Sequence, residues 1–144
     1  MSIKQAAWTH GLGIELESRS WSALRQGFYT TVRPSNERTS GWVHFVIPTP
    51  VIVDGTRLKA ESAMIRFSTG SDAAITNFHV YDGEKKIAEY NGLSLKGNLQ
   101  FVREAVPGNP QVQWGTAISL GVQFNGTGQD AYVQFISAGI DFYA

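Results

Sequence analysis

The sequence contains no cysteine, and only 17% of its 144 residues carry a charge. Without cysteine there is no disulfide framework, no thiolate metal site and no cysteine nucleophile. Twelve basic residues balance twelve acidic residues, so the formal net charge is zero. Because proteins that bind nucleic acid or an anionic membrane need a basic excess or a basic stripe, we expect neither as a partner.

Long hydrophobic segments are also missing. The longest apolar runs, such as residues 51–53, are far shorter than the roughly 20 residues that span a bilayer. The segment that begins the sequence contains a single Lys4 and no apolar run of the length found in signal peptides. These features predict a cytoplasmic protein, and a length of 144 residues suits one domain over residues 1–144.

Apolar residues alternate with small or polar residues along much of the chain, and no segment shows the period of a helix. The clearest case is residues 116–124, where Ile118, Leu120, Val122 and Phe124 are the apolar members. Such alternation predicts a β-strand with one row of side chains on the core. Weaker alternation predicts eight further strands, over residues 13–17, 28–33, 42–47, 58–68, 74–81, 85–90, 99–106 and 131–143.

Two Asp-Gly pairs, Asp54-Gly55 and Asp82-Gly83, lie between short strand-like segments. Both residue types tolerate the positive φ angles of two-residue hairpin turns, so each pair predicts a tight β-hairpin. Further turns are predicted at residues 91–92, 108–110 and 125–128, where Gly, Asn and Pro gather.

The apolar residues change phase near the carboxyl end of the chain. Val133 and Phe135 share one parity, whereas Ala138, Ile140 and Phe142 share the other. One regular strand cannot keep both sets on the core, so we expect a bulge or bend near residues 136–137. Residues 58–68 show the same conflict and predict a second bent strand.

Eight or nine strands with regular turns and no helix predict an all-β, antiparallel β-sandwich. We favour a jelly-roll-like arrangement over an immunoglobulin-like one. The chain exceeds the roughly 100 residues of the immunoglobulin fold, and the Cys–Trp–Cys pattern of that fold is absent. A small closed barrel is the main alternative.

Motifs for catalysis or metal binding are absent. No Gly-x-Ser-x-Gly elbow occurs, and the sequence predicts no catalytic residue, no metal site and no cofactor. His44 and His79 are each flanked by core-type residues, so their own side chains point to the opposite face of their strands. We expect both imidazoles to face solvent or form hydrogen bonds; shared metal binding is the alternative. An enzymatic hypothesis requires one of them beside an acid in a concave pocket.

The four tryptophans are the most unusual feature of the composition. Trp42 and Trp114 lie near predicted strand ends, where an indole caps the sandwich, anchors an interface or stacks on a sugar. Two arginines that bracket a polar loop form a candidate clamp for a carboxylate or phosphate. The candidate ligand-binding residues are Trp42, Trp114, Asn109, Gln111, Gln113, Arg33 and Arg38.

The last predicted strand is apolar on both parities, and residues 131–144 contain one acid and no base. Such a strand is buried on both faces, either inside the sandwich or against a partner. This pattern favours a homo-oligomer. Our leading hypothesis is a non-enzymatic protein that binds or self-assembles; the alternative is a lectin-like carbohydrate-binding module.

Three stretches carry a resemblance to known sequences. They are residues 6–11 (Ala-Ala-Trp-Thr-His-Gly), residues 47–55 (Ile-Pro-Thr-Pro-Val-Ile-Val-Asp-Gly) and residues 80–83 (Val-Tyr-Asp-Gly). Together they resemble a group of small uncharacterised bacterial proteins with no assigned activity. In outline, the strand pattern also resembles jelly-roll carbohydrate-binding modules, which is a likeness of fold alone.

Overall fold

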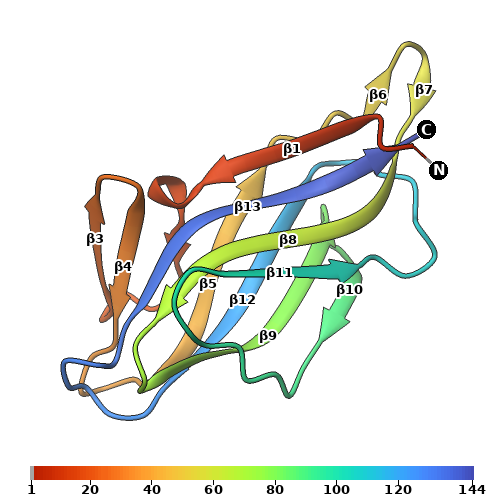
Figure 1. Cartoon of the computed structure of the whole chain (residues 1–144). Coiled ribbons are helices and arrows are strands. Elements are labelled where there is room, and N and C mark those ends of the chain that lie inside the picture. The colour runs from red at the N-terminus through yellow and green to blue at the C-terminus, as the bar shows by residue number, and fades with distance from the viewer. Residues whose placement is uncertain (1) are drawn as a thin grey trace.

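The computed structural model describes residues 2–144, which form two packed antiparallel sheets and a small separate hairpin (Figure 1). The predicted all-β, jelly-roll-like sandwich is confirmed. No helix within residues 2–144 is long and apolar enough to cross a membrane. The strands are β1 (Gln5–His10), β2 (Glu15–Leu16), β3 (Ser22–Gln26), β4 (Tyr29–Arg33), β5 (Ser40–Ile47), β6 (Ile52–Val53), β7 (Thr56–Arg57), β8 (Lys59–Thr69), β9 (Ala73–Asp82), β10 (Lys85–Tyr90), β11 (Gln100–Ala105), β12 (Thr116–Phe124) and β13 (Val133–Tyr143), with the 3-10 turn η1 (Gly11–Gly13) after β1.

Each layer of the sandwich is one sheet. Sheet A has the order β11-β8-β13-β4-β3, with β1 also paired to β13. Sheet B has the order β10-β9-β12-β5-β2. Figure 1 shows β1, β13, β8 and β11 in one layer, with β5, β12 and β9 in the layer behind it.

The core lies between the sheets and contains the inward row of each strand. Phe45 on β5 meets Phe135 on β13 edge to face, with ring centroids 5.7 Å apart and planes at 73°. This contact joins the two layers. The aromatic side chains that are fully buried are Phe45, Phe67, Phe78, Phe124, Phe135 and Phe142.

β13 changes neighbours at the place where its apolar residues change phase. Residues 133–135 pair with β4, and residues 137–142 pair with β1. The register against β8 shifts between Phe135 and Ser137, which confirms the predicted bulge. The extra residue turns the second half of the strand, so that Ile140 and Phe142 also reach the core.

β8 contains the second predicted irregularity. Phe142 pairs with Ala60 and Asp141 with Ser62, which leaves Glu61 as an extra residue in β8. The shift brings Leu58 and Ile65 onto the core despite their opposite parity. Met64 is fully buried but lies outside the core cluster, because alternation places it on the outer face of sheet A.

Both Asp-Gly hairpins form. Asp54 and Gly55 have φ angles of 50° and 76° and connect β6 to β7, as the sequence predicted. The second hairpin differs by one position, because Asp82 still pairs with Lys85 and the loop begins at Gly83. The carboxylate of Asp82 is thereby free to bind a neighbouring loop, as described below.

All nine predicted strands are present, and two of them, residues 85–90 and 116–124, have the predicted bounds. Four further strands of residues 2–144 were not predicted. β1 and β3 bury few side chains, and β6 and β7 are very short, so none of them shows a clear apolar row. The missed strands are β1, β3, β6 and β7.

Candidate functional site

The outer face of sheet B carries two adjacent rows of polar and aromatic residues. In one row, Trp42 on β5 lies opposite Gly121 on β12, and Gly121 lies opposite Asn77 on β9. Alternate residues of a strand share a face, so the next outward row lies two residues along each strand. That row consists of His44, Ser119 and His79.

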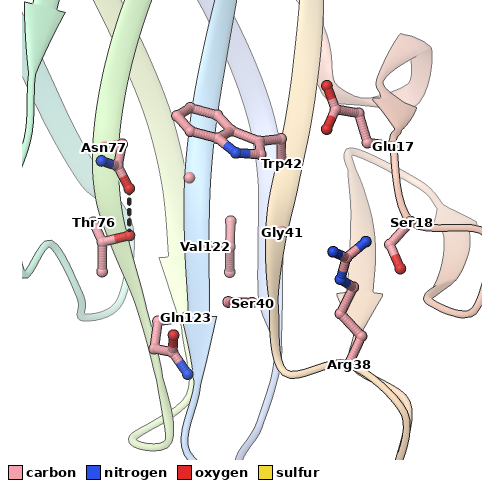
Figure 2. Close-up of a pocket in the computed structure, with 11 residues that line it drawn as sticks. Glu17, Ser18, Arg38, Ser40, Gly41, Trp42, Thr76, Asn77, Val122 and Gln123 are labelled. Carbon is pink, nitrogen blue, oxygen red and sulfur yellow. Dashed lines mark hydrogen bonds between the residues drawn. The ribbon is translucent and has the colours of Figure 1, made fainter.

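A groove runs along these rows. It comprises two adjoining hollows of about 300 and 310 Å³, both lined by Glu17 and Trp42. We call the two hollows together the sheet B groove. One hollow extends from Trp42 to Arg38 (Figure 2), and the other extends from Trp42 to Tyr81 and Lys86. Trp42 therefore lies at the middle of the groove.

The indole of Trp42 is half-buried and extends from β5 across β12 towards β9 (Figure 2). Its ring centroid lies 4.9 Å from that of His79, with the planes at 47°. Gly121 lies on β12 between Trp42 on β5 and Asn77 on β9. Any β-carbon at this position would collide with the Asn77 side chain. The missing side chain thus lets Asn77 reach over β12 next to the indole.

One hydrogen-bonded network borders the indole on the β9 side. Asn91 Oδ1 accepts from Asn77 Nδ2 at 2.8 Å and from His79 Nε2 at 2.7 Å. Thr76 Oγ1 donates to Asn77 Oδ1 at 2.8 Å, as Figure 2 shows. Each side chain holds the next, so the amide of Asn77 has one fixed orientation.

An ion pair extends this network. Lys86 Nζ donates to Glu89 Oε2 at 2.9 Å. The hydrogen bond from Lys86, followed by one from Asn91, lowers the pKa of Glu89 below its ordinary value. The same hydrogen bond raises the pKa of Lys86. Both groups are therefore charged around neutral pH.

A second network borders the indole on the β5 side. Glu17 Oε1 lies 2.9 Å from His44 Nε2, and His44 Nδ1 lies 2.8 Å from Ser119 Oγ. An ionised carboxylate only accepts, so His44 Nε2–H donates to Glu17. In the neutral ring, Nδ1 then accepts from the Ser119 hydroxyl. The prediction that His44 and His79 form hydrogen bonds is confirmed.

Arg38 is the second predicted ligand residue that the structure brings to the groove. Its carbonyl accepts from Trp21 Nε1 at 2.9 Å, which fixes the backbone of the loop before β5. Its guanidinium extends over the hollow beside Ser18 (Figure 2). Glu17 lines the same hollow but pairs with His44 instead of Arg38.

Trp114 lies elsewhere, in the loop before β12. Trp114 precedes β12, and Thr116 at the start of β12 is five residues from Gly121, so the loop begins roughly 16 Å from the Trp42 row along the strand direction. The Asp82 carboxylate holds the loop by accepting from the backbone N–H groups of Gln113, Trp114 and Gly115 at 2.8, 2.9 and 3.2 Å. The indole itself is 76% exposed.

The other candidates are also outside the groove. Arg33 is on β4 of sheet A, donates to Gln129 O at 3.0 Å and lies over the Tyr132 ring. Asn109, with a φ of 42°, makes a turn through an N–H bond to Val106 O, and Gln111 pairs with Lys59. The structure thus separates Trp42 and Arg38 from Trp114, Asn109, Gln111, Gln113 and Arg33.

Sequence reasoning missed Glu17, Thr76, Asn77 and Ser119. Polar residues at alternate positions of a strand were the only available signal, and many surface strands share it. Within residues 2–144, no three His, Asp or Glu side chains converge as a metal site would require.

The whole described chain matches one family. Residues 2–144 fit a family of unknown function, DUF6623. The chain belongs to this family. The match agrees with the resemblance to small proteins without an assigned activity, and no curated protein matches the sequence.

The fold of this DUF6623 protein is similar to that of solved carbohydrate-binding modules. A low-affinity xylan-binding module, CBM86, from Roseburia intestinalis has a TM-score of 0.57 and 11% identity, with 96% of each chain covered. A family 29 carbohydrate-binding module from Piromyces equi has a TM-score of 0.52 and 10% identity, covering 94% of this chain and 90% of that one. At these identities the likeness is one of fold.

Proposed function

We propose that this protein is a non-catalytic carbohydrate-binding module that binds a glycan chain in the sheet B groove. One observation carries the proposal: the half-buried indole of Trp42 lies in the groove between two preformed hydrogen-bond networks. In this role Trp42 stacks on a sugar ring, and Asn77, Glu17 and Arg38 bind its hydroxyl groups.

The arrangement suits the chemistry of a sugar. A pyranose ring has a face of C–H groups, which pack on the electron-rich face of an indole, and a rim of hydroxyl groups that donate and accept hydrogen bonds. Side chains that already hold one another lose little conformational freedom when a ligand binds. The networks beside Trp42 therefore lower the entropic cost of recognition.

The fold neighbours support the carbohydrate hypothesis over the self-assembly hypothesis. Both compared structures are named as carbohydrate-binding modules, one of them for xylan. The burial of β13 on both faces also has an explanation within one chain, since on its outer face the Trp8 ring covers Gly139 and Arg103 pairs with Asp141. A homo-oligomer remains a prediction.

The hydrogen-bonded series Glu17–His44–Ser119 has the acid–histidine–serine order of a catalytic triad. A catalytic role for it therefore needs a test. Ser119 lies within a strand that is paired on both sides, so nearby backbone N–H groups serve the sheet and leave no backbone oxyanion hole. We expect a fluorophosphonate probe to leave Ser119 unlabelled, and Ser119→Ala to leave the background hydrolysis of 4-nitrophenyl acetate unchanged. Labelling that disappears in Ser119→Ala would identify a nucleophilic serine and contradict the non-catalytic proposal.

Affinity gel electrophoresis tests the proposed function. The protein is run through native gels that contain soluble xylan, mixed-linkage β-glucan, glucomannan or galactan, beside a non-binding reference protein. We expect at least one polysaccharide to retard it relative to the reference. Equal mobility in all four gels would remove the support for carbohydrate binding.

A further inference from the structure

The outer face of sheet A, on the opposite side of the sandwich from the groove, carries two exposed aromatic side chains. Trp8 on β1 is 42% exposed and Phe101 on β11 is 50% exposed. Their ring planes are close to parallel, at 29° to each other, and the ring centroids lie 6.5 Å apart. These residues come from the two strands that flank β13 and β8, so the rings meet across the middle of the sheet.

Gly139 lets the indole lie flat on the sheet. It is the direct partner of Trp8 in the β1–β13 pair. A β-carbon added to Gly139 would lie 2.5 to 2.8 Å from three ring atoms of Trp8, Cδ2, Cε2 and Cγ. Because that β-carbon would point out of the sheet into the ring, one face of the indole covers Gly139 and the other faces solvent.

Met64 lies on the same outer face, on β8 between the strands that carry the two rings. It lies opposite Gly139 in the β13–β8 pair and opposite Arg103 in the β8–β11 pair. It has no exposed surface although it points away from the core. Trp8 belongs to this row and Phe101 to the neighbouring row, and we call their two rings the sheet A platform. The platform is therefore packed onto the sheet and does not move freely on a loop.

Charged groups border the platform. Arg103 donates to Asp141 Oδ2 at 2.8 Å and to Ser62 Oγ at 2.6 Å, in the next row of the same face. On the other side, Arg66 donates to Leu99 O at 2.7 Å. Like the sheet B groove, this surface combines an exposed aromatic face with polar side chains that hydrogen bonds hold in place at its edges.

We propose that the sheet A platform is a second carbohydrate-binding surface, which stacks on the flat face of a polysaccharide chain. Two sites on opposite layers make the protein bivalent, so that one molecule joins two polysaccharide chains. The proposal rests on the proposed function for the class of ligand, but it uses none of the groove residues. A second copy of the chain is a poorer occupant, because two aromatic side chains bordered by charges are far smaller than the roughly 800 Å² per partner of a stable interface.

The test truncates the groove tryptophan first and then one aromatic residue of the platform. Binding to insoluble xylan and to microcrystalline cellulose is measured by depletion from solution for Trp42→Ala. We expect this variant to remain on at least one of the two solids. Adding Trp8→Ala or Phe101→Ala weakens the remaining binding about three- to tenfold, as expected when one stacked aromatic contact is lost.

Two further variants separate binding from folding. Gly139→Ala keeps both aromatic rings but lifts the indole from the sheet, and it is expected to weaken binding as Trp8→Ala does. Phe28→Ala removes an aromatic ring that is 59% exposed in the turn between β3 and β4, and it is expected to leave binding unchanged. Circular dichroism spectra that match the wild type confirm that each variant is folded.

The outcomes are distinct for the two sites. Retention of Trp42→Ala that is lost when Trp8→Ala is added supports the platform, and the native gels with soluble polysaccharides test the groove separately. Retention that Trp42→Ala alone abolishes supports the groove and overturns the platform. No Trp8-dependent retention on either solid overturns the second site. A dimer in light scattering that dissociates in Trp8→Ala, without retention on either solid, also overturns it and assigns the surface to a second copy.

Discussion

Trp42→Ala is expected to weaken binding of the best soluble polysaccharide by about 30-fold or more. Truncation of a central, half-buried aromatic residue that anchors a ligand costs about 2 kcal/mol or more, and each 1.4 kcal/mol is about tenfold in affinity. The indole lies at the place where the two hollows meet, so its removal takes the stacking surface from both. The dissociation constant from isothermal titration calorimetry with a soluble oligosaccharide measures the effect.

Trp114→Ala is the matched control. It removes an indole that is 76% exposed and lies outside both hollows of the groove. We expect its affinity to stay within about twofold of the wild type, since a contact worth less than 0.5 kcal/mol changes affinity by about that factor. If Trp114→Ala loses binding and Trp42→Ala retains it, the binding site is at the end of the sandwich and the groove assignment is wrong.

Asp82→Ala is expected to lower the free energy of unfolding by about 3 to 5 kcal/mol. A hydrogen bond to a charged group contributes about 1.5 to 3 kcal/mol, and in this exposed loop water replaces part of the three that are lost. Asp82 is 3% exposed and accepts from three consecutive backbone N–H groups of the loop before β12. Alanine leaves these donors without a partner and releases the loop that carries Trp114. Urea denaturation followed by tryptophan fluorescence measures the change.

Two variants show whether the carboxylate is responsible. Asp82→Asn keeps one acceptor oxygen, so we expect a smaller loss of about 1 to 3 kcal/mol. Glu84→Ala removes an exposed acid from the same hairpin loop, and it should change stability by no more than about 0.5 kcal/mol. If Asp82→Ala is as stable as Glu84→Ala, the three N–H bonds do not hold the loop.

The fold could be predicted in large part because the core strands have regular apolar rows. The parity change between Phe135 and Ala138 located a bulge to within one residue, since a strand can bury both sets only if an extra residue is inserted. β1 and β3 could not be predicted in this way. They bury few side chains, so their pairing depends on neighbours that are distant in the sequence.

The site was less predictable than the fold. Trp42 and Arg38 were identified as candidates from residue type and from their place beside a polar loop. Their partners could not be identified, because His44 and Ser119 are 75 positions apart and meet only through the order of strands in sheet B. Alternation shows which face a residue occupies, but it does not show which strand lies next to it.

The most direct test of the groove is an NMR titration of the tryptophan indole N–H resonances with an oligosaccharide of the polysaccharide that retards the protein in the gels. Assignment comes from the single Trp variants. We predict that the Trp42 resonance shifts progressively and saturates while the Trp114 resonance stays in place. An unchanged Trp42 resonance at millimolar oligosaccharide, with or without movement of Trp114, would contradict glycan binding in the sheet B groove.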